Sequence, residues 1–427
     1  MSQNASTVSA PPAAIGKTQI KAFIGAYLGY ALDAMDFLLL SMIMPLIIKD
    51  LKVPLPYAAF LFSATLLGAF LGGIIFGIYT DRLGRIKTMT ITILGYAIAT
   101  GLCGLAPNFT ILLILRFIVG LFLGGEWGAG AALVTEVWPA NWRGRISGLL
   151  ISSWQVGTGL AALVTLFVAP AWGWRTVFFI GVLPAILALW VRLSVAESPV
   201  WLETKKALEK KKEPSSGMGP ESKQGSRNPL AEMFSGNLRP RAILISLKMG
   251  CILFVLWGIL AWLPMVLASP PRNLSIVRSM GYMMIFALGN LVGQILMGFF
   301  MDWVGRKKAF LTVFVLGAIM LVIYPRVIDI NTLFWAGFFL GVFVFAPMGG
   351  IAAYTGELFP TRMRGTAINW GMGFGRGVSV LAPIFLAALA PYMGLGGAFV
   401  TLALFYGVSF LAMLWLPETK GTEFRPG

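Results

Sequence analysis

The chain has 427 residues, of which 58% are hydrophobic and only 12% are charged, and its formal net charge is +16. A soluble domain of this length could not hide so much apolar surface, so the composition excludes a soluble globular protein and indicates a membrane protein. The positive charge does not point to nucleic acid, because its distribution follows the membrane topology described below.

Apolar runs of about 20 residues, the length that crosses a bilayer as a helix, occur about twelve times along the chain. Strands of a membrane barrel are excluded, because the runs are too long and too uniformly apolar. The sequence therefore predicts an all-α membrane protein with twelve transmembrane helices, near residues 22–48, 57–79, 89–105, 110–134, 146–169, 176–194, 242–267, 280–301, 309–324, 332–354, 366–391 and 398–416.

The distribution of Lys and Arg orients these spans. With the spans placed as above, 23 of the 33 basic residues fall on the side that holds both termini, 6 on the opposite side and 4 inside spans. The positive-inside rule then predicts that both termini are cytoplasmic. The segment before Lys17 has no signal-peptide pattern, so the first span is expected to direct insertion. We expect a multi-pass protein of the plasma membrane, the inner membrane in a bacterial or archaeal cell.

An internal repeat divides the chain into two halves. One constant shift along the sequence, which we call the repeat shift, lays Gly68 on Gly289, Asp81 on Asp302 and Arg85 on Arg306, and without a gap it also lays Glu136 on Glu357. One register that holds across separate motifs indicates two six-helix bundles in parallel arrangement, as in transporters whose halves rock about a central site. The expected domains are residues 22–196 and 241–416, with a cytoplasmic tail at 1–21, a linker at 197–240 and a second tail at 417–427.

The linker begins with "SPVWLETKKALEKKK", which could form a basic amphipathic helix at the cytoplasmic face, and continues as a flexible tether. Cys103 and Cys251 both lie in apolar spans, and two such thiols form neither a disulfide framework nor a metal site. We expect no cofactor.

Several motifs resemble those of the major facilitator superfamily. "GIYTDRLGRIK" (residues 77–87) and its echo "GFFMDWVGRKK" (298–308) are similar to the signature loop of that superfamily, and "RFIVGLFLGGEWGAG" (116–130) resembles its helix-4 motif. "ESPVWL", "GELFPTRMRGTA" and "PETKG" are similar to its other landmarks. The resemblance covers nearly the whole chain from about Ala22 and implies the twelve-helix fold of that superfamily.

The charged residues of these loops are interpreted as a gate. Asp81 can pair with arginines at a helix end and cap backbone donors, and breaking such a cluster would bias one of two packings. The alternative, that these residues only fix loop topology and insertion, remains open. The proposed gating residues are Asp81, Arg85, Glu136 and Arg143 in the first half and Asp302, Arg306, Glu357 and Arg364 in the second.

Three carboxyl groups lie deep inside spans, where each costs about 2.5 to 3.5 kcal/mol on insertion scales. Asp33 and Asp36 share one face of the first span because they are three residues apart, and Glu126 lies near the middle of the fourth. The chain contains no histidine, so proton uptake near neutral pH would need buried carboxyl groups. We interpret these three acids as proton-coupling residues, with a structural ion pair as the alternative.

Deep arginines complement these acids. Arg376, in the eleventh span, could hold a carboxylate substrate through two parallel hydrogen bonds, and Arg116 could either assist or only stabilise its own half. Lys248 and Arg192 lie closer to span ends, where they are expected to snorkel. The polar residues expected to complete the substrate site are Tyr30, Gln155, Asn290 and Gln294; helix packing is the alternative for each.

The stretches "LDAMDFLLL" and "GGEWGAGAALVTEVWPANWRGRISGLL" look most like sialate and monocarboxylate (lactate, pyruvate) proton symporters, with aromatic-acid symporters as near relatives. One departure is that the seventh span lacks the histidine and Gln-Asp pair often found in those carriers. The resemblance implies a monomeric secondary transporter that moves a small organic anion together with a proton, by alternating access.

Other classes remain possible from the sequence. An aromatic-acid or other metabolite transporter, a uniporter or a drug exporter would share the fold, and a membrane receptor would bind without moving its ligand. An enzyme is not expected, because the sequence has no metal cluster, nucleophile paired with a base, or nucleotide loop.

Overall fold

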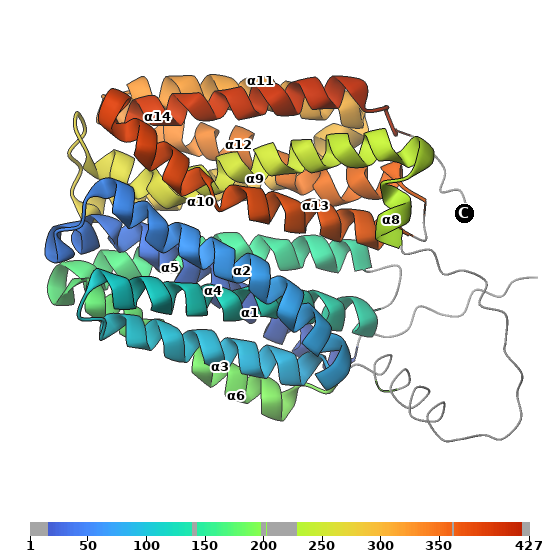
Figure 1. The fold of residues 1–427 in the computed structure, drawn as a ribbon, viewed down its shortest axis with the longest axis horizontal. Coiled ribbons are helices and arrows are strands. Elements are labelled where there is room, and N and C mark those ends of the chain that lie inside the picture. Colours follow the sequence, from blue (N-terminus) through green and yellow to red (C-terminus); the bar gives the residue numbers. More distant parts are fainter. Residues whose placement is uncertain (1–15, 139–142, 198–201, 203–228, 361–362, 421–427) are drawn as a thin grey trace, which may run out of the picture.

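The structure, a computed structural model, describes residues 16–138, 143–197, 202, 229–360 and 363–420. Within these ranges the secondary structure is helical and forms two bundles that lie side by side (Figure 1). Most of the expected linker, including its basic amphipathic stretch, lies outside the described residues.

The first bundle contains α1 (Lys17–Leu51), α2 (Leu55–Leu83), α3 (Arg85–Gly104), α4 (Phe109–Val137), α5 (Arg143–Ile180) and α6 (Pro184–Ser194). The second contains α8 (Pro229–Met233), η1 (Gly236–Leu238), α9 (Arg239–Ala268), α10 (Ile276–Val304), α11 (Arg306–Ile323), η2 (Tyr324–Arg326), α12 (Ile330–Leu358), α13 (Arg364–Ser379) and α14 (Ala382–Trp415). We refer to these bundles as the N half and the C half.

Ten continuous apolar segments in the described chain are long enough to cross a membrane, and two of them cross twice. The double crossings, 43 and 50 residues long, turn back at Gly173 and Gly394, where φ is +77° and +71°. Such left-handed backbone favours glycine, and the repeat shift lays the first of these glycines on the second. The twelve predicted transmembrane helices in two six-helix bundles are therefore confirmed.

The repeat also fixes how helices pack inside each half. In the N half, a Cβ added to Gly72 of α2 would fall on the backbone carbonyl of Leu121 in α4. In the C half, a Cβ at the equivalent Gly293 of α10 would fall on the carbonyl of Val342 in α12. Glycine is required at both positions because the helix backbones touch, which is how membrane helices associate closely.

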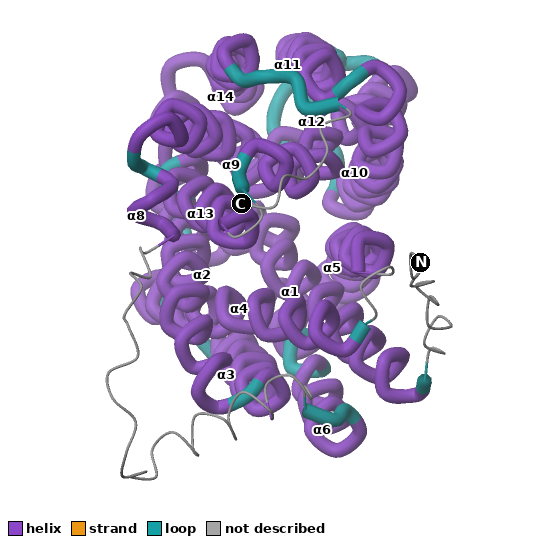
Figure 2. Tube along the Cα trace, turned by 90° about the vertical axis from the view of Figure 1, so that its right-hand side faces the viewer, coloured by secondary structure: helices purple, strands orange, loops and turns teal. Residues whose placement is uncertain are grey.

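The described chain begins and ends at the same end of the molecule, where α1 starts and where α14 ends (Figure 1). We call this the terminal end and the other the opposite end. Viewed along the bundle, α1, α2, α5, α9, α10 and α13 lie where the halves meet (Figure 2).

The halves are joined by contacts from the middle of the molecule toward the opposite end. The hydroxyl of Ser41 on α1 donates hydrogen bonds to the carbonyls of Leu260 and, at 3.0 Å, Ala261 on α9. One turn nearer the terminal end, the rings of Phe37 and Trp257 lie 4.7 Å apart between their centroids. These contacts close the opposite end of the interface.

Candidate functional site

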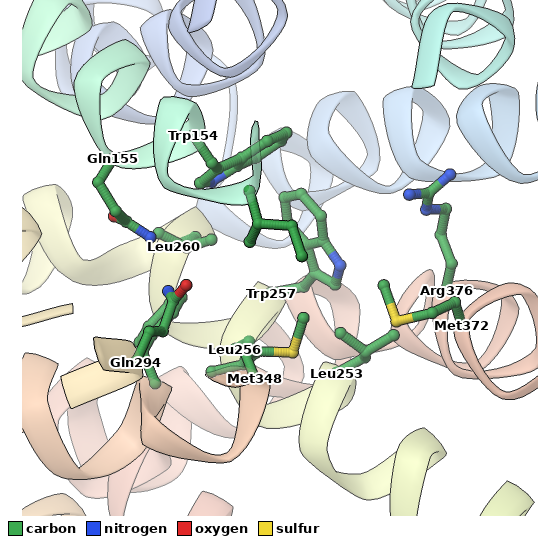
Figure 3. Close-up of a pocket in the computed structure, with 12 residues that line it drawn as sticks. Trp154, Gln155, Leu253, Leu256, Trp257, Leu260, Gln294, Met348, Met372 and Arg376 are labelled. Carbon is green, nitrogen blue, oxygen red and sulfur yellow. The ribbon is translucent and has the colours of Figure 1, made fainter. Parts of the chain in front are cut away.

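A central cavity of about 100 Å³ lies between the halves and is lined by α5, α9, α10, α12 and α13 (Figure 3). A smaller cavity of about 40 Å³ adjoins it, and Trp154, Trp257 and Arg376 line both. The second cavity adds Tyr30 and Asp33 from α1. The two cavities therefore form one site with walls from both halves.

Aromatic rings form the wall on the side of the opposite end. Trp154 of α5 and Trp257 of α9 meet edge to face at 5.8 Å, and Phe37 packs edge to face against Phe62 of α2 at 5.1 Å. We call Phe37, Phe62, Trp154 and Trp257 the aromatic cluster. Edge-to-face pairs are the favoured geometry for rings, so the cluster gives the site an apolar and well-defined wall.

Arg376 brings the only positive charge among the described residues that line these cavities. It lies on α13 in the C half, and the groups that interact with it electrostatically are Tyr30 and Asp33 of the N half. Its guanidinium points into the cavity (Figure 3). A guanidinium in this position faces either a protein carboxylate or an anion in the cavity.

Behind Asp33, further into the N half, lies a second carboxyl group. Glu126 of α4 is fully buried and interacts with Asp33, as does the hydroxyl of Tyr96 of α3. The two Glu126 oxygens, Asp33 Oδ1 and the Tyr96 hydroxyl have no hydrogen-bond partner among the described residues. A Cβ on Gly29 would overlap the Glu126 carboxylate, so the carboxylate lies directly against the α1 backbone.

Asp36 and Arg116 form a separate cluster that does not line the cavity. Arg116 Nη1 lies 4.0 Å from Asp36 Oδ2, and both side chains are fully buried. The same guanidinium donates to Cys103 Sγ at 3.3 Å and to Thr100 Oγ1 at 3.2 Å, and it packs 4.7 Å from the centre of the Phe178 ring. Arg116 is thus held inside the N half, away from the substrate position predicted for it.

The predicted amide residues meet across the interface. Asn290 Nδ2 on α10 donates to Gln155 Oε1 on α5 at 3.3 Å, and Gln294 lies one turn further along α10 on the cavity wall. Asn290 itself is buried behind Gln155. Of the residues predicted for the substrate site, the structure gathers Arg376, Tyr30, Gln155 and Gln294 on the cavity and places Asn290 directly behind it.

The predicted gating residues form matching clusters at the terminal end of each half. Arg85 binds Glu136 with two hydrogen bonds of 3.1 and 2.7 Å, and Arg306 binds Glu357 through the same atoms at 3.2 and 3.1 Å. Arg306 also pairs with Asp302 at 3.0 Å. The side chains of Asp81, Arg143 and Arg364 lie outside the described part.

Two glutamates that sequence reasoning did not select complete these clusters. Glu197 accepts the backbone N–H groups of Arg85 and Ile86 at the start of α3, and Glu418 accepts those of Arg306 and Lys307 at the start of α11. The repeat shift lays Glu197 on Glu418, so the internal repeat could have identified both glutamates from the sequence. Each caps a helix that follows a glycine with φ near +100°.

The side chain of Lys248 does not lie where it was predicted. It does not snorkel to a span end but is fully buried inside the C half, with Nζ 4.5 Å from the Phe310 ring centre and 4.4 Å from that of Tyr354. The ammonium is thus surrounded by aromatic faces, which attract a cation. The side chain of Arg192, for which snorkelling was also predicted, is not described.

Two pseudo-symmetric six-helix bundles around a central cavity are the architecture of a membrane transporter. Comparison with known proteins agrees. The family described as the Major Facilitator Superfamily matches residues 26–287 and 279–427, and the chain belongs to this family.

Individual relatives share most of their length with this chain. The sialic acid transporter NanX of Escherichia coli (strain K12) is 30% identical, with 90% of each chain covered. The niacin transporter NiaP of Acinetobacter baylyi is 32% identical with 84% of each covered, and the cis,cis-muconate transport protein of the same organism is 30% identical with 90% of this chain and 91% of the relative covered.

Among solved structures, the inward-open xylose transporter XylE from E. coli has a TM-score of 0.76 at 18% identity, with 95% of this chain and 98% of that chain covered. This likeness concerns the fold. Together the comparisons identify a multi-pass transporter for small molecules and not an enzyme.

Proposed function

We propose that this protein is a proton-coupled symporter that carries a small organic anion, a monocarboxylate, across the inner membrane of its cell. The observation that carries the proposal is the position of Arg376, which lies on the C half and lines, together with Asp33 of the N half, a cavity with few other polar groups. The relatives named for sialic acid, niacin and muconate support an organic-acid substrate.

The coupling follows from competition for Arg376. In this proposal Asp33 is ionised in the empty carrier, where the charge of the Arg376 guanidinium on the other side of the cavity stabilises it. A substrate carboxylate binds the guanidinium through two parallel hydrogen bonds and so replaces Asp33 as its partner. Asp33 then has Glu126 as its charged neighbour, and two carboxylates that face each other in a buried site repel each other. Entry of the anion is therefore favoured when a proton enters the Asp33–Glu126 pair, and this links the two movements.

Alternating access requires the halves to part at the opposite end and close at the terminal end. The contacts that must break are those of Ser41 with α9 and of Phe37 with Trp257. In this proposal the Arg85–Glu136 and Arg306–Glu357 pairs, with Asp81, Asp302, Arg143 and Arg364, shape the loops that meet at the terminal end when it closes. With both termini cytoplasmic, this proposal assigns the described arrangement to the inward-facing state.

The aromatic cluster favours a substrate with a flat apolar body over lactate or pyruvate. Rings on the substrate could stack against Trp154 or Trp257, whereas a two- or three-carbon acid would leave these faces uncovered. We therefore expect a ring-bearing or conjugated monocarboxylate.

Uptake into proteoliposomes tests the proposal. Labelled lactate, pyruvate, benzoate and nicotinate are offered with an inward proton gradient and again with a protonophore. We expect at least one ring-bearing acid to accumulate above its external concentration, and the protonophore to abolish this accumulation. Equilibration without accumulation in both conditions would identify a uniporter and contradict the proposal.

A further inference from the structure

Gln155 and Arg376 occupy the same position in the two repeats. The repeat shift lays Gln155 of α5 on Arg376 of α13, and both side chains line the central cavity. Halves in parallel arrangement are related by an axis along the membrane normal, so equivalent positions lie on opposite sides of that axis. Figure 3 shows this directly, with the Gln155 amide at one end of the cavity and the Arg376 guanidinium at the other.

The amide of Gln155 is oriented by its neighbour. Because Asn290 Nδ2 donates to Gln155 Oε1 at 3.3 Å, the Nε2 group of Gln155 is left as a donor toward the cavity. Asn290 is fixed in turn against α12, where a Cβ on Gly341 would lie 2.8 Å from its Oδ1 atom. Gln294 adds a second amide on the same side of the cavity.

Between these two ends the cavity is apolar. The side chains there include Leu253, Leu256, Trp257, Met348 and Met372. Its volume of about 100 Å³ is of the same order as the ~150 Å³ of an engineered apolar cavity that binds benzene. The space suits a body the size of one six-membered ring.

We infer that the site selects a ring-sized monocarboxylate that carries a neutral hydrogen-bond acceptor on the side away from its carboxylate. The carboxylate binds Arg376, and the acceptor, a ring nitrogen or a carbonyl or ether oxygen, accepts a hydrogen bond from Gln155 Nε2. This inference deepens the proposed function and rests on it, because it assumes that Arg376 holds the substrate carboxylate.

The amide end also selects against a second negative charge. Among the described residues that line the two cavities, Arg376 is the one cation, and its partner at the other end is a neutral amide. A dicarboxylate would have to bury its second carboxylate against Gln155 without a cation, which is strongly unfavourable. Gln155 is thus a specificity-determining residue, and Asn290 positions it.

The test uses acids of one shape that differ at the end away from the carboxylate. Dissociation constants are measured by calorimetry on the full chain in detergent at one pH, for benzoate, nicotinate, isonicotinate and terephthalate. We expect nicotinate or isonicotinate to bind about fivefold more tightly than benzoate, the value of one net hydrogen bond. Terephthalate should bind most weakly.

Variants test whether the Gln155 amide causes the preference for the ring-nitrogen acids. Gln155→Leu should remove the preference, so that the ring-nitrogen acids and benzoate bind with equal affinity. An unfolding temperature close to that of the wild type shows that the variant is folded. Asn290→Leu should reduce the preference for the ring-nitrogen acids in the same way. Val156→Ile changes the exposed neighbour of Gln155 on α5, which does not line the cavity, and should keep the wild-type ratios.

The outcomes separate this inference from the proposed function. If the monocarboxylates bind through Arg376 with equal affinity, or if Gln155→Leu leaves the ring-nitrogen preference unchanged, the inference is wrong and the proposed function stands. If none of the four acids binds, or if Arg376→Ala does not weaken their binding, the proposed function fails and the inference fails with it.

Discussion

The hydroxyl of Ser41 on α1 donates a hydrogen bond to the carbonyl of Leu260 on α9, and this carbonyl has no helical N–H partner because the residue four positions on is Pro264. The bond thus satisfies a backbone acceptor that would otherwise be buried and unpaired at the closed end of the interface. It links the two halves directly, so its loss should change the balance between the two states of the carrier.

We expect Ser41→Ala to favour the outward-open state by about fivefold, because the Leu260 carbonyl is left without a donor only while the opposite end is closed. Spin labels at Tyr57 of α2 and Val277 of α10, both exposed, report the separation of the halves when Cys103 and Cys251 are changed to serine. Ser41→Thr keeps the hydroxyl and serves as the control. An unchanged distance distribution in Ser41→Ala would contradict this role.

Arg85 and Glu136, with their equivalents Arg306 and Glu357, should matter for movement and not for substrate binding. We expect Glu136→Gln or Glu357→Gln to lower the transport rate at least about tenfold. Each change removes an ion pair that is held by two hydrogen bonds and leaves the central cavity unchanged. Transport and calorimetric binding are measured on the same preparation. Equal loss of binding and transport would assign these pairs to folding.

The cap at the start of α11 makes a pH-dependent contribution to stability. Partial burial alone would raise the pKa of Glu418, but hydrogen bonds from the backbone N–H groups of Lys420, Arg306, Lys307 and Thr419 outweigh it and hold the pKa below its usual range. The stabilisation is therefore fully present above the unfolded pKa of about 4.3 and is lost as the pH falls through the lower folded value.

Glu418→Gln should accordingly lower the unfolding temperature at pH 7 by an amount that corresponds to about 1 kcal/mol, the usual worth of a helix cap. The difference from wild type should shrink as the pH falls below about 4. Thermal unfolding in detergent at a series of pH values measures this difference. A difference that grows at low pH would show that the carboxylate is not the stabilising form.

Much of the architecture could be predicted from the sequence, and the reason is physical. A bilayer requires long apolar runs, and the repeat shift is explicit in the positions of Gly72 and Gly293, so spans and halves follow. The same shift placed Arg85 and Arg306 in equivalent loops, where the structure finds them paired with Glu136 and Glu357.

Which face of each helix points to the cavity and which to the lipid could not be predicted in the same way. Helices in a membrane are apolar toward both lipid and protein, so no amphipathic pattern told whether Trp154 and Trp257 face the bilayer or the cavity. For the same reason the sequence left open whether Arg116 assists the site or stabilises its own half, where the structure buries it against Asp36. Lys248 was expected at a span end but is buried. Ser41 gave no signal, because its partner is a backbone carbonyl exposed by a proline on another helix.

Arg376→Lys should weaken the binding of a monocarboxylate by about tenfold, because a point charge cannot reproduce the two parallel hydrogen bonds of a guanidinium. Calorimetry with benzoate and nicotinate measures the change. Arg278→Lys, the same exchange at an exposed position at the start of α10, is the matched control and should leave the dissociation constants within about twofold. Retention of wild-type affinity in Arg376→Lys would exclude a two-pronged contact.

The central claim, that a buried carboxyl group couples anion movement to a proton, is tested most directly by comparing two transport modes in one set of variants. Asp33→Asn, Asp36→Asn and Glu126→Gln are reconstituted separately, and both gradient-driven accumulation and the exchange of labelled for unlabelled substrate are measured. Exchange needs only the loaded carrier to move, whereas accumulation also needs the empty carrier to return after it has released its proton. The account predicts that Asp33→Asn abolishes accumulation and preserves exchange, and that Asp36→Asn, which alters the pair with Arg116, does not separate the two modes in this way. Full gradient-driven accumulation in all three variants would contradict it.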